Sequence, residues 1–415
     1  MVTVPRPGSK SLIRDLNRSL VFNLIAECGP ISRIELARKA KLTAATIGTI
    51  VGDFLAAQLV LESDALETAR GRPQIYLRIN PKAGYVVGVK LREFQMTVAI
   101  CDMACTVIAS HTVAMEKGIE PHRAIPLIAD AIEESITATK IPRDHVLGVG
   151  IGVSGSVDAQ QGLLRYSNLL NWHNVELGAV LEYKLRMPVG VDNDVNTLAI
   201  AERHFGVARD ASNCLLLTIG RGIGLSLVLN GEVYRGTYGG SSGFGHMTID
   251  LGPDAPLCTC GKRGCLEAIA SDYGIAHAAL GTPFGFSDEE TMAALQQQAL
   301  AGDERIRAIF TRAAQALGIG LANIMNIFDP SLILLGGEGL RAESLLLDTI
   351  RQTIPQHLFG DTRPDVPFIV CSTDDIGWAR GAASIVLREV FRPPLYETNR
   401  NLPIDVLLNR KHSSV

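Results

Sequence analysis

The sequence predicts an α/β protein in which a small N-terminal winged helix-turn-helix head precedes a larger body of two α/β lobes. At 415 residues the chain is too long for one ordinary core and predicts two or three domains of about 150 residues each. Residues 1–80 hold 11 Lys and Arg against 7 Asp and Glu, whereas the rest of the chain holds 28 against 36. A basic head on an acidic body is typical of a nucleic-acid-binding module joined to one that does not bind nucleic acid.

The head is predicted within residues 11–80 as three helices and a two-stranded wing. Gly29-Pro30 ends the first helix, Ser32 and Glu35 form a capping box for the second, and Thr43 caps the third. A tight turn between the last two helices makes them a helix-turn-helix. Apolar residues at helical spacing supply the buried faces: Leu16, Leu20, Leu24 and Ile25 in the first helix, Leu36, Ala37 and Ala40 in the second, and Ile47, Ile50, Val51, Phe54 and Leu55 in the third.

DNA contact is predicted at two places in the head. The start of the third helix offers small residues that let its backbone enter a major groove, namely Thr43, Ala44, Ala45, Thr46 and Thr49. Strands at 59–61 and 75–79 form the wing, whose tip, Arg70-Gly71-Arg72-Pro73, suits the narrow minor groove of A·T-rich DNA. The alternative for this tip is an ordinary solvated loop. Because paired half-sites need paired heads, we expect a homodimer or homotetramer on an A·T-rich palindromic operator of double-stranded DNA.

The body is predicted as a first lobe at 83–200, completed by 375–392, and a second lobe at 201–374, with a tail at 393–415. Three strands, a helix and a further strand open the first lobe, and another set of strands opens the second. The strands are expected at 84–91, 96–100, 107–113, 146–151, 215–219, 225–229, 233–234 and 332–335, with a helix at 122–137. Ligands usually bind in the cleft between two such lobes.

A structural zinc site is predicted from three clustered cysteines and one histidine. Cys258, Cys260 and Cys265, with His246 upstream, fill a tetrahedral shell and leave no open position. Gly261 and Gly264 permit the chain to curl so that all three thiolates reach one ion. The alternative is three free thiols on a loop, which are prone to oxidation without a metal. The remaining cysteines lie among apolar residues and are interpreted as buried free thiols: Cys28, Cys101, Cys105, Cys214 and Cys371.

The zinc-loop sequence, with Glu267 two residues after Cys265, resembles the signature of the ROK family of repressors, open reading frames and kinases. The likeness covers nearly the whole chain, and further stretches similar to family motifs lie at 150–158, 167–172, 192–196, 326–330 and 335–337. Because the family's kinases lack the winged head, the chain resembles the subfamily of xylose-repressor and N-acetylglucosamine-repressor type. The resemblance implies a two-lobed actin-like, RNase H-like sugar-kinase fold for the body.

The resemblance also nominates a sugar site in the cleft, at Gly155, Asn168, Asn193, Asp194, His246 and Glu267. For each of these the alternative is an ordinary polar or turn residue in a loop. Asp194 matches the base that takes a proton from the attacking hydroxyl in the family's kinases. One position departs from the family pattern, since Gly243 stands where the family has Glu two residues before the Gly-His pair.

The phosphate-binding turns differ from those of the family's kinases. Lys90 replaces a carboxylate that helps hold Mg²⁺, and Arg92 and Glu93 add bulk and charge where backbone amides must approach phosphate oxygens. In the second Gly-rich turn, at 218–224, Arg221 stands where the kinases carry a small hydroxyl residue. We therefore expect no use of ATP, with Asp194 a vestigial base that binds sugar hydroxyls instead.

These features predict a DNA-binding repressor of carbohydrate uptake or catabolism genes that responds to a small sugar or sugar phosphate and is not an enzyme. The alternatives are a bifunctional ATP-dependent sugar kinase with a DNA-binding head, favoured by Asp194, and a ligand-blind repressor, favoured by Gly243. No run of about 18 uninterrupted apolar residues and no signal-peptide region occurs, so we expect a cytoplasmic protein without a membrane partner.

Overall fold

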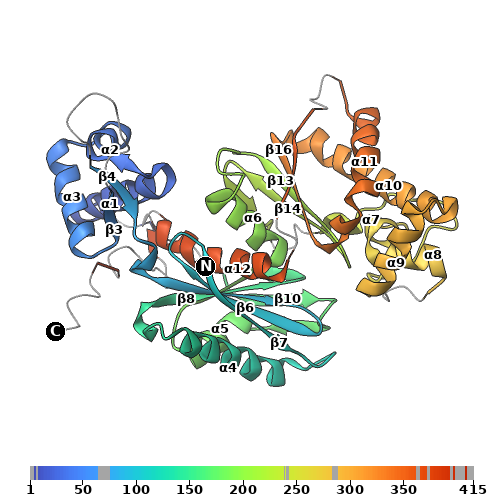
Figure 1. Cartoon of the computed structure of the whole chain (residues 1–415), viewed down its shortest axis with the longest axis horizontal. Coiled ribbons are helices and arrows are strands. Elements are labelled where there is room, and N and C mark those ends of the chain that lie inside the picture. Colours follow the sequence, from blue (N-terminus) through green and yellow to red (C-terminus); the bar gives the residue numbers. More distant parts are fainter. Residues whose placement is uncertain are drawn as a thin grey trace.

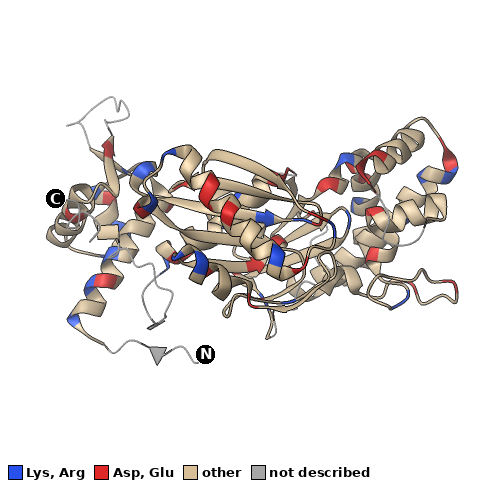
Figure 2. Ribbon diagram, turned by 90° about the horizontal axis from the view of Figure 1, so that it is seen from below, with Lys and Arg blue, Asp and Glu red and all other residues tan. Residues whose placement is uncertain are grey.

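The computed structural model describes residues 4–5, 8–63, 75–237, 239, 243–282, 288–360, 365–371, 374–392, 396–397 and 407–408. The head, the first lobe and the second lobe follow one another along the long axis of the molecule (Figure 1). A view at right angles again places the head at one end and the helices of the second lobe at the other (Figure 2).

Three helices and a three-stranded sheet make up the head, with strand order β2-β4-β3. The predicted caps are present: the Ser32 hydroxyl accepts from the Glu35 N–H while the Glu35 carboxylate accepts from the Ser32 N–H, and Thr43 caps the third helix. The strand β2 was not predicted. The elements are α1 (Lys10–Cys28), β2 (Ile31–Ser32), α2 (Arg33–Ala40), α3 (Ala44–Ala56), β3 (Val60–Ser63) and β4 (Tyr76–Ile79).

The buried face of α1 differs from the predicted stripe. Leu20, predicted to be buried, is 41% exposed, whereas Phe22 is fully buried. Phe22 packs edge-on against Phe54 of α3 on one side and stacks on Phe391 on the other. Since Phe391 comes from the far end of the chain, the head sequence alone gives no sign of the surface that turns α1 toward the body.

The first lobe is built on a five-stranded sheet of order β12-β8-β5-β6-β7, in which the pairs β12·β8 and β8·β5 are parallel. Helices α4 and α5 lie below this sheet in Figure 1, and α12 lies above it. A small sheet of β9, β10 and β11 adjoins the cleft end. The bounds are β5 (Tyr85–Leu91), β6 (Gln95–Asp102), β7 (Val107–Ala114), α4 (Pro121–Thr139), β8 (Val146–Val153), β9 (Ser156–Asp158), β10 (Leu163–Ser167), β11 (Trp172–Val175), α5 (Leu177–Leu185), β12 (Val189–Asn193) and α12 (Asp375–Phe391). Helix α6 (Asp194–Phe205) follows β12 and packs between α12 and the strands of the second lobe (Figure 1).

Helix α12 is seated unusually close to the first sheet. A Cβ atom added at Gly88 would lie 1.9 Å from the carbonyl oxygen of Ala379, and one added at Gly150 would lie 1.9 Å from that of Ala382. Only glycine in β5 and β8 lets the helix backbone approach this far. The helix and the sheet therefore behave as one rigid unit, because interiors packed to this density transmit displacement rather than absorb it.

The second lobe has its own five-stranded sheet, of order β15-β14-β13-β16-β17, covered by helices that extend to the far end of the molecule (Figure 1). The bounds are β13 (Cys214–Ile219), β14 (Ile223–Leu229), β15 (Glu232–Tyr234), α7 (Leu266–Ala270), α8 (Asp272–Leu280), α9 (Glu289–Leu300), α10 (Glu304–Phe328), β16 (Leu332–Gly336), α11 (Glu343–His357) and β17 (Phe368–Val370). Short 3₁₀ turns occur at Pro81–Ala83, Arg143–His145, Gly243–His246 and Glu338–Ala342.

Within the part of the chain that the structure describes, α10 has the length and apolar composition of a membrane span, although 56% of that window is buried inside the protein. Its apolar face, which includes Phe310, Leu317 and Leu321, packs into the core of the second lobe. Three polar residues, Gln315, Asn323 and Asn326, interrupt its last sixteen residues. This helix is accordingly the central core helix of the lobe.

The head and the first lobe share one hydrophobic core. This core includes Phe22 and Ile25 of α1, Cys101 of β6, and Val386 and Val390 of α12. The side-chain amide of Asn23 also donates to the Phe391 carbonyl at 2.7 Å. From the region predicted as a tail, Tyr396–Glu397 (β18) pairs with Val4–Pro5 (β1), and the side chain of Leu407 is buried in the same core.

Candidate functional site

A cavity of about 570 Å³ lies between the two lobes. This volume is within the range of small-molecule sites. Strand ends and turns from both lobes line it, so the cavity exists only where the two domains meet. It brings together all six residues nominated for sugar binding, namely Gly155, Asn168, Asn193, Asp194, His246 and Glu267.

Asn193 holds the first-lobe wall of the cavity in place. It ends β12, and its Oδ1 accepts from the backbone N–H groups of Val195 and Asn196 at the start of α6. Its Nδ2 donates to the carbonyl oxygen of Gly155 at 3.0 Å. Gly155 has φ +126°, and a Cβ there would lie 2.1 Å from a backbone oxygen, so only glycine is accommodated. Both polar functions of Asn193 therefore have partners inside the protein.

Asn168 also lines the cavity and is exposed. Its Oδ1 accepts a hydrogen bond from the Tyr166 hydroxyl at 3.0 Å. The amide nitrogen of Asn168 supplies donors, which complement the acceptor oxygens of sugar hydroxyls.

His246 and Glu267 form the second-lobe wall. Glu267 Oε2 accepts from the Ile223 N–H at 3.3 Å, and Glu267 Oε1 lies 3.9 Å from His246 Nδ1. Gly243 also lines the cavity, and a Cβ atom added there would meet no described atom within 4 Å. The first atom of a longer side chain is therefore not obstructed at the position where the family has its additional glutamate.

Asp194 is ion-paired with Lys90, and this pair dominates the electrostatics of the cleft. The Lys90 ammonium donates to Asp194 Oδ2, and the two side chains are only 9% and 10% exposed. Oδ1 accepts from the Val195 N–H at 2.9 Å, and the ammonium lies 4.3 Å from the centre of the Trp378 ring. Both oxygens of the Asp194 carboxylate therefore already accept hydrogen bonds from groups of the protein itself.

Arg92 lies in the turn after β5 and forms two ion pairs. Its guanidinium donates to Asp375 at 2.8 Å and to Glu338 at 3.0 Å. Asp375 opens α12, and Gln95 also donates to it at 2.6 Å. Glu338 belongs to the second lobe, so Arg92 links the two lobes across the cavity.

Arg221, in the second Gly-rich turn, also forms an ion pair across the cleft. Its guanidinium donates to Glu93 at 2.6 Å and to the Tyr273 hydroxyl at 2.9 Å. Glu93 belongs to the first lobe and is buried. A second ion pair thus crosses the cleft where a nucleotide would place its phosphates in a kinase.

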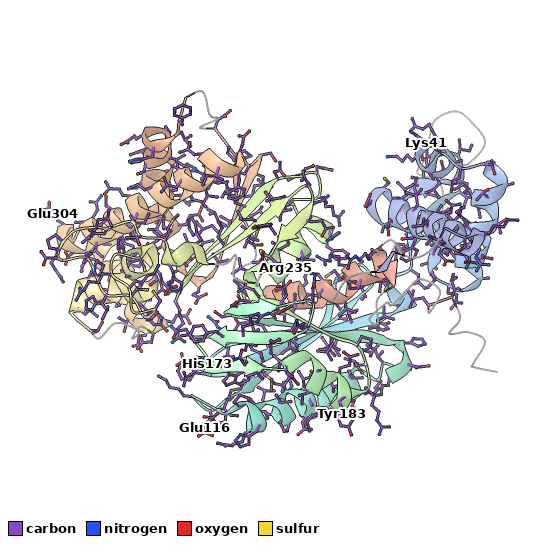
Figure 3. All side chains as sticks on the ribbon, turned by 180° about the vertical axis from the view of Figure 1, so that it is seen from behind. Lys41, Glu116, His173, Tyr183, Arg235 and Glu304 are labelled. Atoms are coloured by element: carbon purple, nitrogen blue, oxygen red, sulfur yellow. The ribbon has the colours of Figure 1, made fainter. Side chains whose placement is uncertain are left out.

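A third ion pair between the lobes involves Asp192, the residue before Asn193 and Asp194. Arg235, at the centre of the molecule in Figure 3, donates from Nε and Nη2 to Asp192 at 2.8 and 2.6 Å. Asp192 is almost fully buried. Because a charge-assisted pair with two N–H donors is geometrically demanding, this contact fixes β12 against the end of β15.

The predicted metal ligands form one compact cluster. The ligand atoms of His246, Cys258, Cys260 and Cys265 all lie within 4.8 Å of one another. His246 Nδ1 is 3.5 Å from Cys258 Sγ, and Cys260 Sγ is 3.7 Å from Cys265 Sγ. Tetrahedral zinc with Zn–S bonds of about 2.3 Å separates its sulfur ligands by about 3.7 Å. The cluster can therefore hold a metal ion of this kind.

The loop geometry explains how four residues spread over twenty positions converge. Gly264 has φ +74°, and a Cβ there would lie 1.8 Å from the Asp250 carbonyl oxygen. Burial raises the pKa of the Cys258 thiol to about 12, so formation of its thiolate requires a cation beside it. A bound metal ion meets that requirement.

The predicted major-groove residues lie at the outer end of the head. Helix α3 is farthest from the lobes in Figure 1, and its first turn is exposed at Thr43, Ala44 and Ala45. Thr46 is partly buried and its backbone N–H donates to the Thr43 hydroxyl, whereas Thr49 is exposed. The predicted wing tip, Arg70, Gly71 and Arg72, lies outside the described residues.

Basic side chains that were not predicted to contact DNA lie beside this helix. Arg38 and Lys39 in the last turn of α2 and Lys41 at its C-cap are exposed, and Figure 3 shows Lys41 at the upper edge of the head. The local signal was a run of cations at the end of the second helix. Such cations position a reading helix through phosphate contacts.

The family model described as "ROK family" matches residues 86–389. The chain belongs to the ROK family. It is 27% identical over 399 residues to the xylose repressor of Caldicellulosiruptor bescii, covering 94% of this chain and all of that repressor. It is 27% identical over 387 residues to the N-acetylglucosamine repressor of Escherichia coli, covering 92% of this chain and 94% of that protein.

Two solved ROK structures differ in how much of the chain they match. A ROK family transcriptional regulator, a homologue of the E. coli MLC protein, has a TM-score of 0.80 at 26% identity and covers 96% of this chain. The match also covers 99% of that regulator's own chain. The second is a ROK family glucokinase from Streptomyces griseus in complex with glucose and AMPPNP, with a TM-score of 0.61 at 26% identity. That match covers 73% of this chain and 99% of the glucokinase chain. The predicted kinase-like fold with an additional head is confirmed.

Proposed function

We propose that this ROK protein is a sugar-responsive transcriptional repressor of carbohydrate uptake or catabolism genes. Its head binds an A·T-rich palindromic operator as a homodimer or homotetramer, and its body binds a sugar without phosphorylating it. The observation that carries the proposal is that a helix-turn-helix shares its core with a kinase-like body whose base, Asp194, is ion-paired with Lys90. Relatives named xylose repressor and N-acetylglucosamine repressor match nearly the whole chain, head included.

Sugar binding without turnover follows from the contents of the cleft. Asp194, Asn168, Glu267 and His246 present acceptors and donors of the kind that pair with sugar hydroxyls. Asn193 contributes by holding Gly155 in place beside them. In the phosphate turns, Arg92 and Arg221 are held by carboxylates. The protein is accordingly a binding protein and not an enzyme.

Helix α12 is the proposed route from effector to DNA. At its start, Asp375 binds Arg92 and Trp378 covers Lys90. At its end, Phe391 stacks on Phe22 of the head. Because α12 is rigidly seated on the first sheet, a rotation of the first lobe around the sugar carries the head with it. In a symmetric oligomer such a rotation changes the spacing of two heads, and so their fit to paired half-sites.

The His246, Cys258, Cys260 and Cys265 cluster holds a structural Zn²⁺ in this proposal. Its four ligands leave no open position, so the ion fixes the loop that leads into Glu267 rather than acting on the sugar. His246 contributes Nδ1 to the cluster and lines the sugar cavity with the rest of its ring. A protein of this function works in the cytoplasm.

Mobility-shift titration of the full-length protein on DNA fragments from its own genomic neighbourhood tests the proposal. Affinity should fall steeply between 50 and 200 mM salt, by on the order of 10³-fold for several phosphate contacts. Arg72→Ala should weaken binding, whereas Arg123→Ala, which lies on the surface of α4 far from the head, should not. Absence of a shift with every neighbouring fragment would refute DNA binding.

The second candidate is a bifunctional sugar kinase, which the presence of Asp194 favours. It predicts release of ADP that depends on both ATP and sugar and disappears in Asp194→Asn. We expect only background release from the wild-type protein.

The third candidate is a ligand-blind repressor, which Gly243 favours. Gly243→Glu restores the family's carboxylate into open space. Calorimetry with hexoses, amino sugars and pentoses separates this candidate from the first. Saturable heat of binding to the wild-type protein with any of these sugars excludes a ligand-blind repressor.

A further inference from the structure

Building on the proposed function, we propose that the effector is an unphosphorylated sugar, because the carboxylate of Glu338 occupies the place where a phosphate would bind. The Glu338 Oε1 accepts from the Arg221 backbone N–H at 3.3 Å and from the Arg92 guanidinium at 3.0 Å. A Cβ added at Gly220 would lie 2.6 Å from the Glu338 Cδ. The carboxylate therefore rests directly on the Gly-rich turn.

A Gly-rich turn binds phosphate through backbone N–H groups and neighbouring cations. In this chain the Arg221 backbone N–H and the Arg92 guanidinium already bind an anion, the Glu338 carboxylate of the second lobe. A phosphoryl group entering the cleft must displace Glu338 before it gains these donors. The displaced carboxylate would then remain close by in the same cavity.

The other cations of the cavity are also paired with carboxylates. Lys90 is bound to Asp194, and Arg221 is bound to Glu93. Arg92 has a second carboxylate partner, Asp375, in addition to Glu338. A phosphate would have to break an existing ion pair to obtain any of these three cations, and the separated carboxylate would be left partly buried without its partner.

The net charge of the cavity lining also disfavours binding of a phosphate. The described cationic residues that line the cavity are Lys90, Arg92 and Arg221, whereas the described carboxylates are Glu93, Asp194, Glu267, Glu338 and Asp375. Among the described residues, the lining thus carries two more negative charges than positive ones. A phosphate monoester brings about two further negative charges at neutral pH.

Sugar hydroxyls suit this lining. A neutral sugar donates to carboxylate oxygens such as those of Glu267 and Asp194, and accepts from amides and from the Lys90 ammonium, without adding charge. It fits beside the ion pairs instead of replacing them.

Calorimetry with matched pairs of ligands tests the inference on the full-length, zinc-loaded protein. The probes are glucose, mannose, fructose and N-acetylglucosamine, each with its 6-phosphate, together with xylose and its 5-phosphate. We expect at least one neutral sugar to bind. Its phosphate ester should bind with an affinity lower by on the order of tenfold or more. A phosphate that binds more tightly than its neutral partner would overturn the inference, and so would the failure of all neutral members.

Glu338→Gln provides the structural control, because it removes the competing charge and keeps the size of the side chain. This variant should gain affinity for inorganic phosphate by on the order of tenfold and narrow the gap between glucose and its 6-phosphate. Glu343→Gln, an exposed position in the first turn of α11, should behave like the wild type. Equal phosphate affinity in all three proteins would contradict the role assigned to Glu338.

The DNA titration described above separates failure of this inference from failure of the proposed function. A protein that binds its operator and releases it with a sugar phosphate remains a sugar-responsive repressor, and only the effector class is then wrong. A protein that binds neutral sugars but no DNA supports the effector class and contradicts the repressor function.

Discussion

Phe22 of the head stacks on Phe391 at the end of α12, with ring centroids 5.4 Å apart and ring planes inclined by 21°. The Asn23 side chain donates to the Phe391 carbonyl at the same joint. Residues separated by almost the whole length of the chain thus form the contact that fixes the head on the first lobe. The head is an extension of the first-lobe core and is not connected to it by a linker alone.

Phe391→Ala should loosen this joint. Loss of a stacked, half-buried ring costs about 1–3 kcal/mol of stability, and the loss should be concentrated in the head. Hydrogen exchange of the α1 amides should accelerate, while exchange in the β5 to β8 sheet stays unchanged. Phe359→Ala is the matched control, since that ring is 85% exposed. Uniform acceleration across head and body would contradict a local joint.

Lys90→Met should destabilise the protein by about 3 kcal/mol, because it leaves the buried Asp194 carboxylate without its partner. Adding Asp194→Asn should recover most of that loss, since the uncompensated charge is then gone. Urea denaturation of the single and double variants measures both effects. Neither protein should release ADP, because the Arg92 and Arg221 ion pairs persist.

Lys117→Met provides the reference for the lysine substitution. Lys117 is 71% exposed and pairs with Glu93 at 3.4 Å, so its loss should change stability by less than about 0.5 kcal/mol. A Lys90→Met protein as stable as Lys117→Met would show that the buried pair contributes nothing.

Features that depend on residues close together in the sequence could be predicted from local patterns. The capping box at Ser32 and Glu35 and the Thr43 cap are contacts between residues three positions apart, and the structure contains both. The metal cluster was predictable for a related reason, because its four residues lie within twenty positions and its glycines define the turns. The face of α3 was also predictable, since Ile47 to Phe54 follow the helical period.

The partners in the cleft could not be predicted in this way. Substitution at Lys90, Arg92 and Arg221 was visible in the sequence as a departure from the kinase pattern. Their partners Glu338 and Asp375 lie far along the chain and carry no local signal, because only the meeting of the two lobes places them there. The same reason explains why burial of Phe22 in α1 was not predicted, since its partner Phe391 belongs to the last long helix.

Removal of the metal should unfold the zinc loop locally. Cys265→Ser, at a fully buried position that begins α7, should reduce the zinc content from one ion per chain to near zero. It should also weaken sugar binding by on the order of tenfold or more, because Glu267 follows two residues later and loses its fixed position. Mass-spectrometric metal analysis and calorimetry measure the two effects.

Cys28→Ser is the control for the cysteine substitution, because Cys28 lies at the end of α1 outside the cluster. Its zinc content and sugar affinity should match the wild type. Full zinc content in Cys265→Ser would exclude Cys265 as a ligand.

His204 should make the protein sensitive to acid. Burial lowers its pKa to about 4, and the cations of Arg388 and Arg203 lower it further against the opposing effect of Glu232. Below pH 6.5 the unfolded chain takes up a proton that the folded chain does not bind, so stability falls as the pH drops from 6.5 toward 4. Above pH 6.5 both states hold the neutral ring and the contribution is fully present.

The loss attributable to His204 should be about 2 kcal/mol over this interval, and urea denaturation at a series of pH values measures it. His204→Gln keeps a polar, uncharged side chain at the end of α6 and should flatten the profile by that amount. His111→Gln, at an exposed position of β7, should leave the profile unchanged. If the His204→Gln and wild-type profiles run parallel between pH 6.5 and 4, the acid sensitivity arises from other groups and the buried, neutral state of His204 is wrong.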